Sequence, residues 1–323
     1  MSIVNHNYNV QSSLDWWTAT KILENPSFQA FQKGEIPLVC IPDAVPPHHI
    51  DSIRFDATAL AATGFGAAAG VGASRSQQAR IRRNVVQTWL QSPNTSPSTF
   101  LMGDMDARQK LLKFVDIIRC NLQQQQQQQQ TASIDDDNDH QDQELCLQGH
   151  HRHPLTSLPP ALVELSYLNY EPGAYYKRHV DVIDDKSNTQ TSGQDDDAVS
   201  RQRRGRQHKR AISMILFLGD GSNNNIDGFY SDCDDDDCYS SSQRPWDVRK
   251  DGGALRIHDS PFVQFTGQPL KRSSDDMDTP TLFSDIPPTS GTMVLFHSAQ
   301  IPHEVLETNR NRVCVVAWFC TPV

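Results

Sequence analysis

Residues 169–181, NYEPGAYYKRHVD, are the stretch that most constrains the fold of this chain. The segment ends in a strand-like run, YYKRHVD, that carries His179 and Asp181 two positions apart. On an extended strand, residues i and i+2 point to the same face, so one imidazole and one carboxylate can bind one metal ion together. A short His-x-Asp pattern also occurs by chance, and a structural histidine is the alternative interpretation.

A third metal ligand must come from elsewhere in the chain, and His303 in QIPHEVLE (300–307) is the best candidate. Two histidines and one carboxylate leave three coordination positions open, which is the arrangement of non-haem Fe(II) oxygenases. The alternative for His303 is an ordinary loop histidine after Pro302.

Arg312 follows His303 by nine positions, and the sequence between them contains ETNRN at 307–311, a composition typical of turns. His303 and Arg312 are therefore predicted to open two successive strands at one end of a barrel. A buried arginine there offers a planar fork for a dicarboxylate. A surface arginine at a strand end is the alternative.

The C-terminal half contains short runs rich in Val, Ile, Leu, Phe and Tyr, with no helical pattern between them. These runs lie at 161–170, 211–218, 253–257, 291–297 and 312–319. Many short strands without intervening helices favour a sandwich or a jelly roll. The polar segments at 184–209, 219–250 and 264–283 are predicted to be surface insertions in this core.

The N-terminal half has a mixed pattern. Residues 1–35 are predicted to form a polar arm with some helical character, and residues 36–122 the helical and strand part of the catalytic domain. Within the latter, the spacing predicts a buried strand at 36–42, helices at 48–62 and 100–122, a mobile Gly/Ala/Ser-rich loop at 63–78 and a strand at 79–90. A disordered Gln/Asp-rich insertion is predicted over 123–160, before the core at 161–323.

Composition excludes several classes of protein. The net charge of -10, without a basic stripe, argues against a nucleic-acid partner. Seven cysteines without a CxxC motif favour a reducing compartment. No secretory signal and no membrane span are expected. The segment SDCDDDDC at 231–238 is predicted to be a solvated acidic loop, the alternative being a calcium or transition-metal loop.

At three places the sequence resembles the prolyl hydroxylases of the Fe(II)/2-oxoglutarate dioxygenase superfamily, most closely the intracellular type that hydroxylates the hypoxia-inducible factor. These are the quoted stretch at 169–181, DGGALRI at 251–257 and IPHEVLETNRNRVCVVAWF at 301–319. The resemblance covers roughly 36–120 and 161–320. It implies a mainly β fold with flanking helices, with a double-stranded β-helix (jelly roll) as its core.

The resemblance also implies roles for individual residues. The family's metal ligands match His179, Asp181 and His303, and residues of the 2-oxoglutarate pocket match Arg312, Tyr170, Leu255 and Trp318. More loosely, RIRRNVVQTW at 80–89 resembles the segment after a substrate-covering loop, which would place Arg83 near the substrate. Phe217 is a departure, because the hypoxia-factor enzymes have a tyrosine that bonds 2-oxoglutarate there.

The implied activity is Fe(II)-, 2-oxoglutarate- and O2-dependent hydroxylation of a proline in an intracellular protein, releasing succinate and CO2, with L-ascorbate as the reductant. A monomer in the cytoplasm or nucleus is expected. Two alternatives remain open: an oxygenase of the same family with another target, such as a ribosomal protein or a small molecule, and a binding protein that uses the barrel without turnover.

Overall fold

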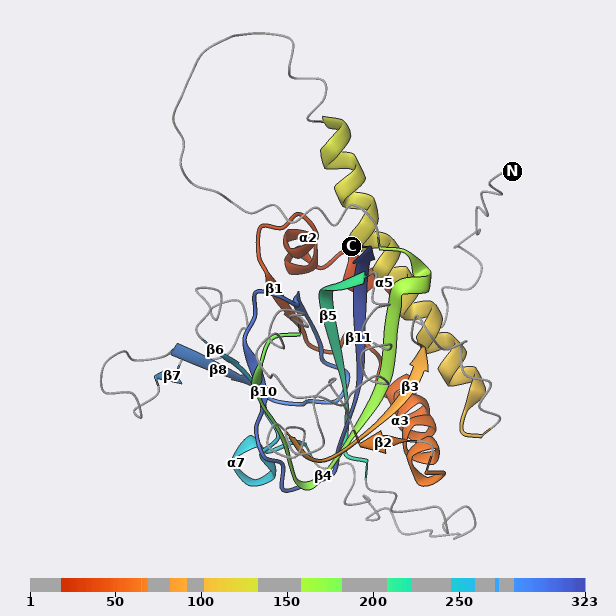
Figure 1. Cartoon of the computed structure of the whole chain (residues 1–323), viewed down its shortest axis with the longest axis vertical. Helices are drawn as coiled ribbons and strands as arrows, with labels where there is room; N and C mark the ends of the chain where they lie inside the picture. The colour runs from red at the N-terminus through yellow and green to blue at the C-terminus, as the bar shows by residue number, and fades with distance from the viewer. Residues whose placement is uncertain are drawn as a thin grey trace, which may run out of the picture.

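The protein folds around one curled antiparallel sheet with helices against one of its faces (Figure 1). The structure is a computed structural model, and it describes residues 19–64, 66–68, 82–91, 102–132, 158–181, 208–221, 245–258, 271–272 and 282–322. No helix within those ranges is long and apolar enough to cross a membrane.

The sheet follows the order β1-β9-β5-β11-β4-β10-β6-β8-β7, with β3 added on β4 and β2 on β3. The strands are β1 (Leu38–Ile41), β2 (Ala67–Ala68), β3 (Arg82–Gln91), β4 (Val163–His179), β5 (His208–Gly219), β6 (Leu255–His258), β7 (Lys271–Arg272), β8 (Leu282–Ile286), β9 (Met293–His297), β10 (His303–Val305) and β11 (Arg312–Pro322). The order interleaves early and late strands, as a jelly roll does, and the mainly β prediction is confirmed.

Both faces of the central strands are buried, and alternate residues of β11 enter two different cores. Val313, Val315 and Phe319 pack in the core between the sheet and the helices. Val316 and Trp318 pack in a second core on the inner face of the curl. Burial on both sides explains why RVCVVAWF shows a continuous apolar run instead of alternation.

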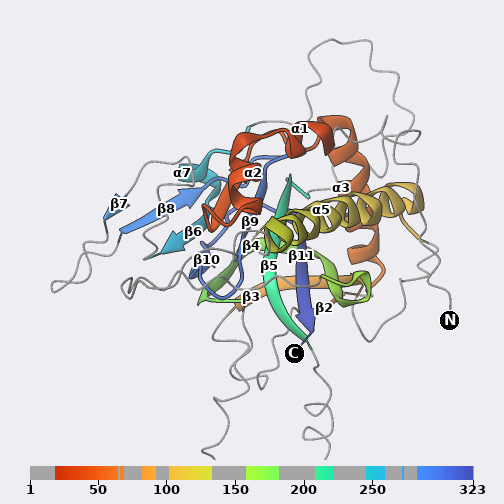
Figure 2. The same cartoon turned by 90° about the horizontal axis from the view of Figure 1, so that it is seen from above.

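The helices are α1 (Ala19–Leu23), α2 (Pro26–Gln32), α3 (Pro47–Ala62), α5 (Met105–Ala132), a 3-10 turn η3 (Pro160–Leu162) and α7 (Val248–Asp251). Figure 2 shows α1, α2, α3 and α5 gathered on one side of the sheet. Ile22, Phe28 and Phe31 are buried in the core there. From α1 onward, the structure therefore differs from the polar arm expected at 1–35. The three apolar side chains anchor α1 and α2 to the domain.

The glutamine run was expected to be disordered, but the part of it that the structure describes is helical. Helix α5 continues through it to Ala132 and projects beyond the sheet in Figure 1. Glutamine is a good helix former, and extending an existing helix avoids the cost of nucleation. At the other end of this predicted insertion, Leu158 is buried, and its carbonyl accepts a bond of 2.7 Å from Arg119 Nη1. Residues 133–157 lie outside the described part of the chain.

Some residues at the ends of the predicted surface insertions belong to regular secondary structure. Strand β5 begins at His208, α7 falls within the second insertion, and β7 and the start of β8 fall within the third. Strand β8 was missed as a separate element, because a run of five residues carries little periodicity. The acidic segment at 231–238 and most of the loop at 63–78 lie outside the described residues.

Two glycines in DGGALRI allow β6 to start against the turn that precedes β11. Gly252 and Gly253 have φ values of 64° and 68°, which side chains rarely adopt. A Cβ atom on Gly252 would collide with the carbonyl oxygen of Glu307. The amide of Gly253 donates to that same carbonyl at 2.9 Å. This close approach places Leu255 and the loop before Arg312 side by side.

Candidate metal and 2-oxoglutarate site

The structure brings His179, Asp181 and His303 together, as the sequence predicted. His179 ends β4, Asp181 follows two residues later, and His303 opens β10 directly opposite His179 in the antiparallel pairing. One ligand atom from each residue lies within 4.8 Å of the other two. The imidazole centroids of His179 and His303 are 4.3 Å apart. These side chains can therefore contact one metal ion.

Backbone carbonyls orient both imidazoles for metal binding. His179 Nδ1 lies 2.8 Å from the carbonyl of Lys177, and His303 Nδ1 lies 3.0 Å from the carbonyl of Ile301. A carbonyl can only accept, so each Nδ1 carries the proton and each Nε2 keeps its lone pair. The two Nε2 atoms face Asp181, at 3.4 Å from Oδ1 and 3.9 Å from Oδ2 respectively.

The protonation states of the cluster suit a metal ion as well. The pKa of His303 is lowered to about 4, mainly by burial and then by the nearby His179. Asp181 raises this pKa, but by less than His179 lowers it. Burial alone would raise the pKa of Asp181, but His303, His179 and Arg210 hold it well below its usual range. A neutral imidazole and an ionised carboxylate are the forms that ligate metals, so no proton has to leave either group on binding.

Asp181 is held by two donors that the sequence analysis did not assign to it. Ser213 Oγ donates to Asp181 Oδ2 at 2.6 Å, and Trp318 Nε1 donates to the same oxygen at 3.0 Å. Ser298 Oγ lies 2.8 Å from Ser213 Oγ and extends this network. Bonds of this kind fix a ligating carboxylate in one orientation. The signal in the sequence was Ser213 itself, a polar residue within the apolar run AISMILFL.

Arg312 opens β11 and is buried, with 1% of its surface exposed. Its Nε and Nη1 atoms have no hydrogen-bond partner among the described residues. Buried guanidinium donors without partners are costly, and the oxygens of a bound carboxylate would supply acceptors for them. The structure therefore favours an anion-binding arginine over the alternative of a strand-end arginine on the surface.

The residues around Arg312 include others that the sequence analysis placed in this pocket. The guanidinium carbon lies 4.6 Å from the ring centroid of Tyr170 and 5.1 Å from that of Phe217. Burial raises the pKa of Tyr170, which keeps its hydroxyl neutral. Leu255 and Trp318 belong to the same inner core. In addition, the indole nitrogen of Trp318 donates to Asp181.

For Arg83, the remaining predicted site residue, the structure describes the backbone alone. Its backbone lies in β3 opposite Tyr175 of β4, beside the strand that ends at His179. The position of its side chain lies outside what the structure describes.

Fold and site together define a class: a jelly roll whose inner face carries two histidines, a carboxylate and a buried arginine is built for non-haem iron chemistry. Residues 165–320, slightly less than half of the chain, match the family model of the 2OG-Fe(II) oxygenase superfamily. This family uses Fe(II), 2-oxoglutarate and O2. The three converging ligand atoms fit Fe(II), and the buried donors of Arg312 fit 2-oxoglutarate.

One solved structure shows the same fold at low sequence identity. A Trichoplax adhaerens prolyl hydroxylase, solved with a hypoxia-inducible-factor peptide fragment, is 13% identical, with a TM-score of 0.51 over 94% of this chain and 91% of that chain. A Pseudomonas putida prolyl-4-hydroxylase is 16% identical, with a TM-score of 0.47 over 93% and 97% of the two chains. No curated protein sequence matches the chain.

Proposed function

We propose that this protein is an Fe(II)- and 2-oxoglutarate-dependent dioxygenase, a prolyl 4-hydroxylase of an intracellular protein, with His179, Asp181 and His303 as its Fe(II) ligands. The observation that carries the oxygenase site is the inward-facing pair of Nε2 atoms around Asp181, beside a buried arginine with unpaired donors. The choice of proline is supported by the resemblance of residues 169–181 and 301–319 to prolyl hydroxylases. The peptide-bound Trichoplax adhaerens enzyme, which shares the fold, is consistent with a protein substrate.

The chain's own residues bind and orient the reactants in this proposal. When bound, iron, 2-oxoglutarate and O2 would supply oxidative decarboxylation to succinate and CO2, with one atom of O2 entering succinate and the other entering the substrate as a hydroxyl group. Arg312 binds the distal carboxylate of 2-oxoglutarate, and Tyr170 contacts that arginine from β4. Ser213 and Trp318 hold Asp181 in place. The inner core around these residues keeps water from the reacting atoms.

Replacing Arg312 by Ala should raise the Michaelis constant for 2-oxoglutarate by at least about tenfold. A bond to a charged group contributes about 1.5–3 kcal/mol, and about 1.4 kcal/mol corresponds to a factor of ten in binding. Turnover should be measured as succinate release over a range of 2-oxoglutarate concentrations. Arg312→Lys keeps the charge but loses the fork and should fall between Arg312→Ala and the unchanged protein.

Arg256 provides the matched control for this experiment. It is another arginine on the sheet, but its Nε already bonds Asp285 Oδ1 at 2.7 Å. Arg256→Ala should leave the Michaelis constant for 2-oxoglutarate within about twofold, since this side chain has its own partner. An Arg312→Ala variant that behaves like Arg256→Ala would require another residue to bind the distal carboxylate.

The substrate assignment is tested in a lysate from cells that lack this protein. The purified chain is added with Fe(II), 2-oxoglutarate and ascorbate, and mass spectrometry locates new peptides that have gained one oxygen atom. We expect these oxidations on proline and none with the His179→Ala variant. New oxidation confined to lysine, asparagine or nucleobases would contradict the prolyl assignment and leave the oxygenase assignment intact.

Ascorbate as the reductant, a monomeric state and a cytoplasmic or nuclear location complete the proposal. Among the described residues, Cys40, Cys120, Cys314 and Cys320 form no disulfide, which suits a reducing compartment. Fractionation of cells that express the tagged chain tests the location, and recovery in the secretory fraction would contradict it.

A further inference from the structure

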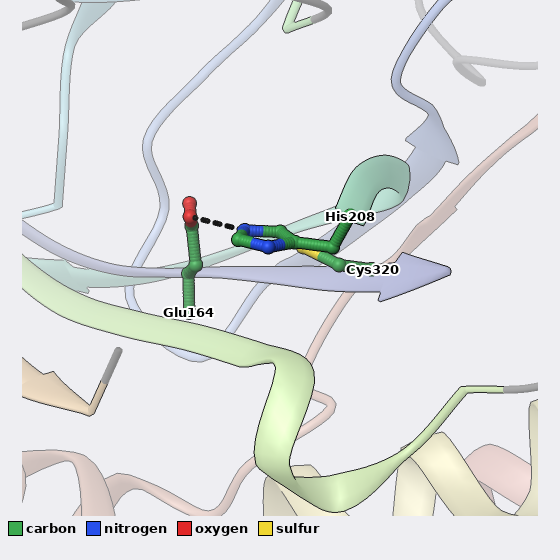
Figure 3. A group of neighbouring side chains, drawn as sticks. All are labelled: Glu164, His208 and Cys320. Atoms are coloured by element: carbon green, nitrogen blue, oxygen red, sulfur yellow. Dashed lines mark hydrogen bonds and ion pairs between the residues drawn. The ribbon is translucent and has the colours of Figure 1, made fainter. Parts of the chain in front are cut away.

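A second group of potential metal ligands lies apart from the iron cluster. Glu164, His208 and Cys320 belong to β4, β5 and β11, and β11 runs between the other two strands. One ligand atom from each residue lies within 4.8 Å of the other two. Figure 3 shows the carboxylate, the imidazole and the sulfur converging from these three strands.

The donor set has the chemistry of a zinc site. A carboxylate oxygen, an imidazole nitrogen and a thiolate sulfur are the three ligand types that Zn2+ takes in proteins. His208 Nε2 and Glu164 Oε1 are 3.3 Å apart, close to the roughly 3.5 Å that tetrahedral zinc bonds of about 2.0–2.3 Å require. The third ligand atom, Cys320 Sγ, lies within 4.8 Å of the other two, so a side-chain adjustment of about 1 Å brings it to bonding distance.

The cluster is buried and its carboxylate is already oriented. Glu164 and Cys320 are buried, and the His208 side chain is only 8% exposed. Arg210 donates to Glu164 Oε2 through Nε at 2.8 Å and Nη2 at 2.5 Å, which leaves Oε1 for His208. Support of a ligating carboxylate from behind is typical of metal sites.

We propose that Glu164, His208 and Cys320 form a second metal site, specific for Zn2+ and related thiophilic divalent ions. Its cysteine distinguishes it from the cluster of His179, Asp181 and His303, whose donors are only nitrogen and oxygen. Zn2+ binding displaces the thiol proton of Cys320 and joins the ends of β5 and β11 to β4. The proposal is independent of the substrate of the dioxygenase.

Cobalt provides a direct spectroscopic test, because Co2+ bonded to a thiolate shows a sulfur-to-metal charge-transfer band in the near ultraviolet. The reduced, metal-free full chain is titrated with Co2+. We expect this band, and we expect Zn2+ to remove it, since Zn2+ binds such ligands more tightly than Co2+. Co2+ in the iron site contributes no such band, because that site has no sulfur.

Variants assign the band to this site. Cys320→Ser should lose it, and His208→Ala should weaken Co2+ binding at this site by at least about tenfold. The matched control is Cys314→Ser, which changes another buried cysteine on the same face of β11 and should keep the band. His179→Ala should also keep it while binding one Co2+ fewer. The proposal is overturned if the unchanged chain binds Co2+ without the band, or if Cys320→Ser retains it.

Discussion

His179→Ala should abolish hydroxylation and lower the affinity for Fe(II) by more than about 100-fold. Losing a residue that only supports a metal ligand costs about 10–100-fold, and loss of a ligand should exceed that range. The backbone already orients His179 for this role, because its Nδ1 bonds the carbonyl of Lys177 and its Nε2 faces Asp181. Alanine leaves Asp181 and His303 as an incomplete set.

The measurement is iron content after dialysis against defined Fe(II), together with succinate release. His258→Ala is the matched control, since this histidine lies on the adjacent strand β6 and its Nε2 is 3.0 Å from Glu304 Oε1 instead of Asp181. We expect the control to keep its iron. Full iron content in His179→Ala would show that the metal binds elsewhere.

Asp56→Ala should lower the free energy of unfolding by about 3–5 kcal/mol, the usual cost of breaking a buried ion pair from one side. Asp56 is fully buried on α3 and accepts bonds from Arg108 Nε at 3.0 Å and Nη2 at 2.5 Å. It also accepts from the hydroxyl of Tyr167 on β4, at 2.8 Å. Alanine would leave a buried guanidinium and a buried hydroxyl short of an acceptor.

Urea unfolding of the metal-free chain measures this loss of stability. Two further variants serve as controls. Asp106→Ala removes an exposed carboxylate that pairs with Lys110 on α5, and it should cost less than about 1 kcal/mol. The double variant Asp56→Leu, Arg108→Met removes both charges and should recover more than half of the loss. A cost below about 1 kcal/mol for Asp56→Ala would mean that water replaces the lost acceptor.

Local pattern was enough to predict much of the fold and most of the candidate site. The two-residue spacing of His179 and Asp181 predicted a shared face, and the turn composition before Arg312 predicted that this arginine opens a strand. Both predictions agree with the structure, in which β10 begins at His303 and β11 at Arg312. Such features depend on backbone geometry over a few residues, and that geometry is directly encoded in sequence spacing.

Tertiary structure alone decided which distant side chains meet. The pairing of β10 with β4 places His303 opposite His179, and the order β5-β11-β4 brings Ser213 and Trp318 to Asp181. Tertiary packing also buries both faces of β11 and includes α1 and α2 in the core. Strand order and register depend on how many distant surfaces fit together at once, and periodicity within a segment carries no information about its partner.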